Sequence, residues 1–427
     1  MKPIIALVIL MTIAATLASA APPVYVQQTA KQSVQRDGLG NVFAKLKAGK
    51  DVNIAYFGGS ITQANGWRPK TLDWFRKTYP QSKITEINAA IGGTGSDLGV
   101  FRCQQDVLSQ KPDLIFVEFA VNDGGAAPES IWRTMEGIVR QAWKANPETD
   151  ICYVYTLVEG FKDDYDKGLF PRATSSDEML ADYYGIPGIS VGFHTAQLAR
   201  DGKLWYTPHK DKDGKEVAPP EGCFVWSGDG VHPNDQGHEV YAQIIEDTLK
   251  QWEPNSAPKP HVVKDPFVAD NYEAAKLVPL DPSMLSAGWT KLPTDKGIGA
   301  DFHHFLPELW TASKPGEKIS FKFKGTAVKL YDLMGPTIGK AIVTIDGKSQ
   351  TIAQFDWWCN WWRLASMGLA EGLPNEVHTV TVEISPEQPD RKVVTDRFKN
   401  DANYDPKAYD GTVMYIGSIM MLGDVVK

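Results

Sequence analysis

Cysteine and concentrated positive charge are scarce in this chain of 427 residues. Lys and Arg number 44 against 52 Asp and Glu and never gather in a dense run, so we do not expect nucleic acid as a partner. An internal repeat and a low-complexity tract are also missing from the sequence. The cysteines are four in number, and their wide spacing argues against a zinc ribbon: Cys103, Cys152, Cys223 and Cys359.

Hydrophobic runs that approach the length of a membrane span are missing beyond the first twenty residues. Residues 1–20 carry Lys2, the apolar stretch Ile4–Leu17 and a small-x-small ending at Ala20, a pattern typical of a secretory signal peptide. We expect cleavage before Ala21, where no cysteine is present to carry a lipid anchor. The mature chain would then lie in the periplasm or outside the cell, unattached to a membrane, with a net charge of −9 (43 basic and 52 acidic residues).

Export would permit disulfides, and four cysteines allow three pairings. The alternative is that some of them are small buried apolar residues. Both interpretations remain open at the level of sequence, as does the oligomeric state.

Two domains are expected, because roughly 400 mature residues exceed what one hydrophobic core usually serves. Short apolar runs alternate with helical patterns from Asp51 to about Trp252, which is typical of a parallel sheet covered by helices, and we assign residues 21–252 to this domain. The expected strands are Val52–Phe57, Ile84–Ala90, Leu114–Phe119, Ile151–Leu157 and Gly188–Val191. The expected helices are Trp67–Tyr79, Leu98–Leu108, Ile131–Ala145, Asp177–Tyr184, Thr195–Asp201 and Gln236–Trp252.

The pattern of apolar and polar residues changes after residue 252. Residues 253–260 hold three prolines in eight positions, so we assign residues 253–268 to a linker. Over residues 269–427, alternating runs are separated by turn residues such as Asp346-Gly347, which predicts an antiparallel β-sandwich. Its expected strands include Lys318–Phe323, Ala327–Tyr331, Ala341–Ile345, His378–Ile384 and Val413–Ile416.

A serine follows two glycines where the first strand ends, in Gly58-Gly59-Ser60-Ile61-Thr62. Open α/β sheets place their sites at the carboxyl ends of strands, and glycine before Ser60 lets the backbone turn sharply. The run lacks the second glycine of the G-x-S-x-G elbow, which counts against the α/β-hydrolase fold. Taken by itself, the pattern is also compatible with an ordinary strand-to-helix turn.

The next two strand ends supply groups that an oxyanion hole needs. Gly92 and Gly93 follow the second strand, and Asn122 follows the third. The backbone amides of Ser60 and Gly93 and the side chain of Asn122 could donate to an anionic tetrahedral intermediate. As single features, they could equally be loop residues.

A carboxylate and a histidine, Asp229 and His232, lie three residues apart in one loop before the last helix. Such spacing lets Asp229 bind the imidazole Nδ1 and leaves Nε2 free to accept the proton of Ser60. Because this pair follows the serine and asparagine motifs, we interpret the three residues as a catalytic triad.

The four segments together resemble the four sequence blocks of the SGNH hydrolase superfamily, also called GDSL esterases and lipases, over residues 51–252. The resemblance implies a flavodoxin-like three-layer α/β/α domain and maps nucleophile, oxyanion-hole and triad roles onto Ser60, Gly93, Asn122, Asp229 and His232. Gly59 and Ala120 depart from the usual aspartate and glycine, but neither change removes a catalytic group. The Gly-Gly-Ser-Ile-Thr variant followed by a β-sandwich is similar to bacterial members that act on carbohydrate esters.

Other residues near these motifs could also belong to the site. Trp67, Arg102 and Trp226 are candidate pocket residues, with packing as the alternative for each. The glycines from Gly93 to Gly99 are misspaced for dinucleotide binding. Because His232 already has a role in the triad, we expect no metal site, and no cofactor is implied.

In the second domain, Trp357, Trp358, Trp361 and Trp362 lie within six residues. Indoles stack on the apolar faces of sugars, so Trp357 and Trp361 are candidate glycan contacts, with core packing as the alternative. We therefore predict a secreted serine esterase that removes short acyl groups, O-acetyl above all, from a polysaccharide. The rival functions are a lipase or small-ester hydrolase, a glycan O-acyltransferase and a non-catalytic glycan-binding protein.

Overall fold

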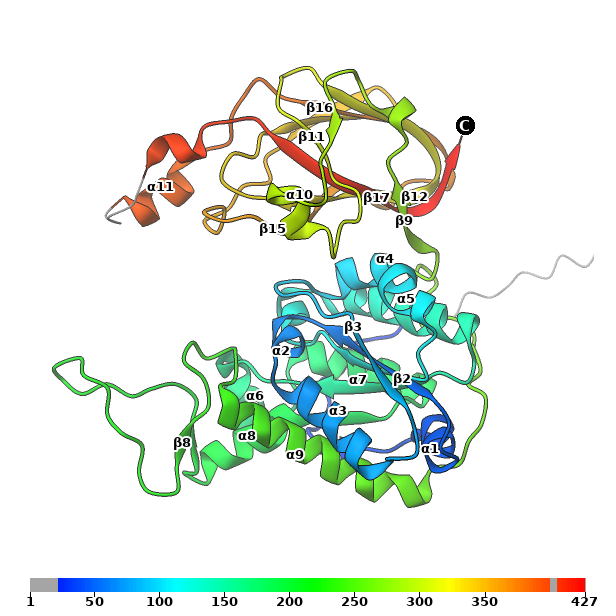
Figure 1. Ribbon diagram of the computed structural model, residues 1–427, viewed down its shortest axis with the longest axis vertical. Coiled ribbons are helices and arrows are strands. Elements are labelled where there is room, and N and C mark those ends of the chain that lie inside the picture. The colour runs from blue at the N-terminus through cyan, green and yellow to red at the C-terminus, as the bar shows by residue number, and fades with distance from the viewer. Residues whose placement is uncertain (1–21, 400–404, 427) are drawn as a thin grey trace, which may run out of the picture.

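The computed structural model describes residues 22–399 and 405–426, so the predicted signal peptide at residues 1–20 lies outside the described residues. Two sheet-based units follow one another along the chain, and Figure 1 shows the second resting on the side of the first that carries helices α4 and α5. The α/β domain with a C-terminal β-sandwich predicted from the sequence is confirmed.

The first sheet has six strands in the order β1-β6-β5-β4-β2-β3. All neighbours pair in parallel except β1 and β6, which are antiparallel. The strand order reverses between β2 and β4, so the carboxyl ends of these two strands adjoin the switch point where open α/β sheets form their sites. The strands are β1 (Ser33–Val34), β2 (Val52–Gly58), β3 (Ile84–Asn88), β4 (Leu114–Glu118), β5 (Asp150–Tyr155) and β6 (Gly188–Ser190).

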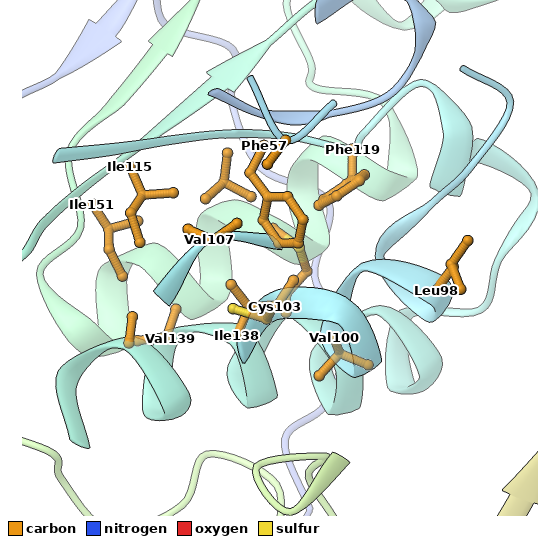
Figure 2. Close-up of a cluster of buried hydrophobic side chains, with 14 of the residues drawn as sticks. Phe57, Leu98, Val100, Cys103, Val107, Ile115, Phe119, Ile138, Val139 and Ile151 are labelled. Atoms are coloured by element: carbon orange, nitrogen blue, oxygen red, sulfur yellow. The ribbon is translucent and has the colours of Figure 1, made fainter. Parts of the chain in front are cut away.

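Helices cover both faces of this sheet, because alternate residues of each strand point to opposite sides. Ala55 and Phe57 of β2 belong to the core beneath α4 and α5, while Ile54 and Tyr56 belong to the opposite core. Figure 2 shows the former core, in which Phe57 lies among apolar side chains of the sheet and of α4 and α5. The helices are α1 (Gly40–Lys47), α3 (Trp67–Thr78), α4 (Ser96–Asp106), α5 (Pro128–Ala145), α6 (Lys162–Asp166), α7 (Arg172–Tyr184), α8 (Val191–Arg200) and α9 (Asp235–Trp252).

The second sheet has nine strands, all paired antiparallel, and is organised by one long strand, β12 (Lys318–Met334). The sequence predicted two separate strands in this region, Lys318–Phe323 and Ala327–Tyr331. The structure has one strand with a register shift at Gly325, where an added Cβ would overlap the carbonyl oxygen of Leu422. The other strands are β9 (Ala275–Pro279), β10 (Thr290–Lys291), β11 (Trp310–Ala312), β13 (Ala341–Ile345), β14 (Lys348–Ile352), β15 (Arg363–Ala370), β16 (Glu376–Ile384) and β17 (Met414–Val426).

The segment that connects the two sheets is packed against the first of them. His261 stacks on Trp143 with ring centroids 4.6 Å apart, and its Nε2 lies 2.8 Å from the buried Asp150 carboxylate. Glu136 of α5 accepts hydrogen bonds from the backbone amides of Phe267 and Val268. These contacts tie the proline-rich connection to the α/β domain along its length.

All four cysteines are free. Cys103, Cys152 and Cys359 are buried and Cys223 is half-buried, so the interpretation as small apolar residues holds for the first three. Burial raises the pKa of the Cys103 thiol to about 12, which keeps the thiol protonated at neutral pH. Among the described residues, we find no helix that combines the length and apolarity needed to cross a bilayer.

Candidate active site

Ser60 lies directly after β2, as the first residue of the one-turn helix α2 (Ser60–Gln63). The preceding strand is buried along nearly its full length, which fixes the point at which the chain leaves the sheet. Gly59 is extended and precedes the helix without a side-chain cap. The half-buried Ser60 side chain therefore stands at the carboxyl edge of the sheet, where the sequence predicted it.

The loop before α9 brings a histidine to this serine across 172 positions of sequence. His232 Nε2 lies 2.8 Å from Ser60 Oγ, and His232 Nδ1 lies 2.7 Å from Asp229 Oδ2. The side chains of His232 and Asp229 are 50% and 56% exposed, so solvent and a substrate can reach both. The three predicted triad residues thus form one continuous hydrogen-bonded chain.

Asp229 is held ionised by its surroundings. Partial burial opposes ionisation, but hydrogen bonds from the His232 ring and from backbone amides at 231 and 232 hold the pKa of this carboxyl well below its usual range. Ser227 adds a further bond, since its hydroxyl donates to Asp229 Oδ1 at 2.9 Å. A charged Asp229 orients the His232 ring and favours a proton on Nδ1.

Asn122 begins the turn η2 (Asn122–Gly125) after β4, and its carboxamide lies against Gly59. A Cβ on Gly59 would overlap the Asn122 side-chain oxygen. In this structure the contact leaves no room for a side chain at position 59. It also brings Asn122 beside the Ser60 turn, as the sequence predicted.

Gly92 and Gly93 lie on the loop that follows β3. A Cβ on Gly92 would come within 3.5 Å of the Ser60 Cβ, so this loop borders the serine directly. Gly93 has φ of +71°, a conformation that strongly favours glycine. The Gln63 side chain accepts a hydrogen bond from the Gly92 amide at 3.0 Å and joins this loop to α2.

Trp67, Arg102 and Trp226 do not contribute to the surface of the site, which corrects their selection as candidate pocket residues. All three are fully buried. Trp67 packs edge-on against Tyr56, and the Arg102 guanidinium lies over the Phe57 ring while it donates to the Ala89 carbonyl. Their closeness to the motifs in sequence reflects packing beneath the site.

Three residues near the site were missed by the sequence analysis. Gln63 and Ser227 hold the loops of Gly92 and Asp229, as described above, and Asp123 accepts from the Ser96 amide at 3.0 Å, which joins the Asn122 turn to the start of α4. Each adjoins a predicted site residue or motif in sequence. That adjacency is the signal that could have identified them.

A cavity of about 400 Å³ begins at Asn122 and lies between the two domains. Its walls are mainly polar on the α/β side and are completed by Lys329 and Glu371 of the β-sandwich region. The lining residues from the first domain include Asp97, Ser130, Arg133 and Thr134, and Tyr272 adds a phenol from the start of the second region. Within the ranges 22–399 and 405–426 there is no cluster of three or more His, Cys, Asp or Glu arranged to hold a metal.

The tryptophan-rich loop between β14 and β15 presents Trp357 and Trp361 to solvent, each 54% exposed. Arg397 of α11 (Lys392–Phe398) lies over the rings of Trp357 and Trp358, at 5.0 Å and 4.1 Å from their centroids. Trp362 instead packs against Tyr415 and against the core shared by the two domains. The cluster is therefore divided between surface and interface.

The whole fold was compared with solved protein structures. Two crystal structures that it resembles are of a two-domain esterase (CEX) active on acetylated mannans. One, co-crystallized with mannopentaose, gives a TM-score of 0.67 at 24% identity and covers 90% of this chain and 94% of that one. The other gives a TM-score of 0.69 at 24% identity and covers 91% and 97%. This likeness extends over both sheet-based units.

Two sequence matches are more local. The uncharacterized lipoprotein YqeF of Bacillus subtilis (strain 168) is 34% identical over 83 residues, which are 18% of this chain. The match spans only 34% of the length of that curated relative. Residues 56–240 match the model of the GDSL-like Lipase/Acylhydrolase family, a range that holds every predicted triad and oxyanion-hole residue. Over this range the chain is similar to GDSL-like acylhydrolases, a family of carboxylic ester hydrolases.

Proposed function

We propose that this protein removes acetyl groups from an acetylated polysaccharide with Ser60 as its nucleophile. The observation that carries the proposal is the chain of hydrogen bonds from Ser60 Oγ through His232 to Asp229, with distances of 2.8 Å and 2.7 Å. A serine bonded to a histidine that a carboxylate orients is the arrangement that activates a hydroxyl for attack on an ester.

In the first step, Ser60 Oγ bonds to the ester carbonyl carbon while its proton passes to His232 Nε2. The tetrahedral intermediate collapses when the bond to the sugar oxygen breaks, and His232 returns the proton to the leaving alcohol. Water then attacks the acyl-enzyme with His232 again as base, which releases acetate and restores Ser60. Asp229 stays ionised and stabilises the imidazolium that forms in each step.

The negative charge of each intermediate needs donors at a fixed place. We assign this role to the backbone amides of Ser60 and Gly93 and to the Asn122 carboxamide. The contact of Asn122 with Gly59, and of the Gly92 loop with Ser60, supports the assignment because both segments lie beside the Ser60 turn. The family match over residues 56–240 supports it as well.

The cavity beside Asn122 supports a carbohydrate as the substrate. Hydroxyl, charged and phenolic groups dominate its lining, which suits a polyhydroxylated sugar better than a long acyl chain. The exposed Trp361 offers an indole face of the kind that stacks on sugar rings. An esterase of the same two-domain fold acts on acetylated mannans, so an acetylated mannan is the first polymer to test. We further propose that the protein is exported, as the pattern over residues 1–20 predicts.

The test is an acetate-release screen on natural acetylated polysaccharides, with acetylated mannan and acetylated xylan in separate arms. We expect release of acetate from at least one polymer and none from the same polymer after chemical deacetylation. Transfer of acetyl to an added glycan, detected as a mass increase without free acetate, would favour an acyltransferase. Hydrolysis restricted to long-chain p-nitrophenyl esters would favour a lipase.

A further inference from the structure

Glu118 is the last residue of β4 and is almost completely buried beneath the Ser60 turn, yet the proposed reaction does not use it. A carboxyl group in a protein core is costly unless its oxygens are satisfied. Burial raises the pKa of Glu118 to about 7 despite the hydrogen bonds that it accepts. The partners of its two oxygens show which parts of the site the Glu118 carboxyl connects.

One oxygen of Glu118 holds the serine turn. The Thr62 hydroxyl donates to Glu118 Oε2 at 2.7 Å, and Thr62 is completely buried. Thr62 lies two residues after Ser60 in the same single-turn helix, α2. The hydrogen bond therefore ties the helix that carries Ser60 to the end of β4.

The other oxygen holds the side of the site that carries the histidine. The Thr156 hydroxyl donates to Glu118 Oε1 at 2.7 Å from the end of β5. Three residues later, the Glu159 amide donates to the Gly230 carbonyl at 2.7 Å, between Asp229 and His232. The intervening Leu157 donates its amide to the Tyr241 hydroxyl of α9, the helix that follows the His232 loop.

We propose that Glu118 is a positioning residue that sets the separation of Ser60 and His232 by holding the Thr62 and Thr156 hydroxyls on its two oxygens. A carboxylate suits this role because it offers two acceptor oxygens, while the amide of glutamine offers one. The inference rests on the proposed function, in which the 2.8 Å contact of Ser60 Oγ with His232 Nε2 carries the proton transfer. Misplacement of reacting groups by about 1 Å can cost on the order of a hundredfold in rate.

The test compares two variants of Thr156 with one matched control variant, all made in the full-length protein. Thr156→Val keeps the shape and removes the hydroxyl, and Thr156→Ser keeps the hydroxyl. Thr195→Val removes an equally buried hydroxyl of α8, which donates to the Val191 carbonyl at 2.8 Å and has no part in the site. For each variant, kcat and KM on p-nitrophenyl acetate and the thermal melting temperature are measured.

We expect Thr156→Val to lose about tenfold or more in kcat with KM little changed, because orientation and not binding is impaired. Thr156→Ser and Thr195→Val should retain kcat, although Thr195→Val loses a comparable buried hydrogen bond. If Thr156→Val does not fold, Thr62→Val tests the same carboxyl from its other oxygen and should show the same loss of kcat.

The outcomes separate the two proposals. A wild-type protein that does not hydrolyse the ester contradicts the proposed function itself. A wild-type protein that does so while a folded Thr156→Val or Thr62→Val variant keeps full kcat overturns the positioning role alone. Equal loss in Thr156→Val and Thr195→Val would assign the effect to general destabilisation and would also overturn it.

Discussion

The tryptophans nearest the triad and those exposed on the β14–β15 loop differ in their surroundings. In the α/β domain, Trp67 and Trp226 are fully buried next to the loops that carry Ser60 and His232. In the β-sandwich region, Trp357 and Trp361 are each about half exposed. Large rings inside a core restrict how the backbone above them can move, whereas exposed rings offer a surface to a ligand. We therefore propose that the first region performs the chemistry and that the second holds the polymer.

The largest effect in this comparison is expected from Ser60→Ala. Without the hydroxyl no acyl-enzyme forms, so kcat should fall about a thousandfold or more. The loss should be equal on p-nitrophenyl acetate and on an acetylated polysaccharide, because both reactions need the same nucleophile. Initial rates on the two substrates check this, and a variant that keeps most of its activity on either would refute the role of Ser60.

Asn122→Ala should have the next largest effect. Removal of one oxyanion donor costs roughly 10²–10³ in kcat, about 3–4 kcal/mol. The side chain lies in a surface turn against Gly59, so folding stability should change little. A loss expressed mainly as a raised KM would instead make Asn122 a substrate-binding residue.

The double variant with Trp357→Ala and Trp361→Ala tests the role of the β-sandwich region. We expect weaker activity on acetylated polysaccharide and nearly unchanged hydrolysis of p-nitrophenyl acetate, since the small ester needs only the triad and the oxyanion hole. Among the single variants, Trp361→Ala should have the larger effect, because Arg397 already lies over the Trp357 ring.

A melting curve must accompany these kinetics, because part of each indole still contacts the protein. Truncation of a fully buried tryptophan lowers the free energy of unfolding by about 3–5 kcal/mol. In a folded double variant, equal losses on both substrates would show that the loop supports the α/β domain. Equal retention would show that the two indoles do not hold this polymer.

The smallest effect concerns pH and Asp332, a completely buried carboxyl of β12. Burial raises its pKa to about 8, so the folded state binds a proton that the unfolded state releases near pH 4. Its contribution to stability is therefore complete at low pH and declines as the pH rises from about 4 to 8. Asp332→Asn removes the ionisation, and we expect its stability relative to wild type to increase by on the order of 1 kcal/mol or more between pH 5 and pH 8.

Urea unfolding of wild type and Asp332→Asn at the two pH values measures this difference. Esterase activity serves as the control, because Asp332 lies in the second region and should leave the triad unaffected. A difference in stability that does not vary with pH would mean that Asp332 is ionised in the folded state at both pH values.

Much of the fold follows from periodicity in the sequence. The parallel strands are short apolar runs, and the predicted start of each agrees with the structure to within one residue, because burial on both faces leaves little room for polar residues. The two-residue strand β1 carries too short a pattern to be recognised. The continuity of β12 was missed, because its two predicted halves are joined at Gly325, where β12 and β17 approach closely.

Burial was harder to predict than identity at the site. Sequence patterns can identify the motif residues Ser60, Asn122 and His232, because their proposed chemistry depends on residue type and spacing. Whether Trp67 or Arg102 faces a ligand depends on the packing of distant segments, which a single sequence does not encode locally. Glu118 escaped notice for the same reason, since it lies in an apolar strand and its threonine partners lie on two other segments.

The account depends most on Ser60 as the nucleophile, and a serine-directed phosphonate tests this directly. After incubation of the full-length protein, intact mass and peptide mapping locate the adduct while residual esterase activity is followed in parallel. We predict one adduct, on Ser60, and loss of activity in proportion to its formation. Stoichiometric labelling of another residue, or full activity after Ser60 is completely modified, would contradict the account.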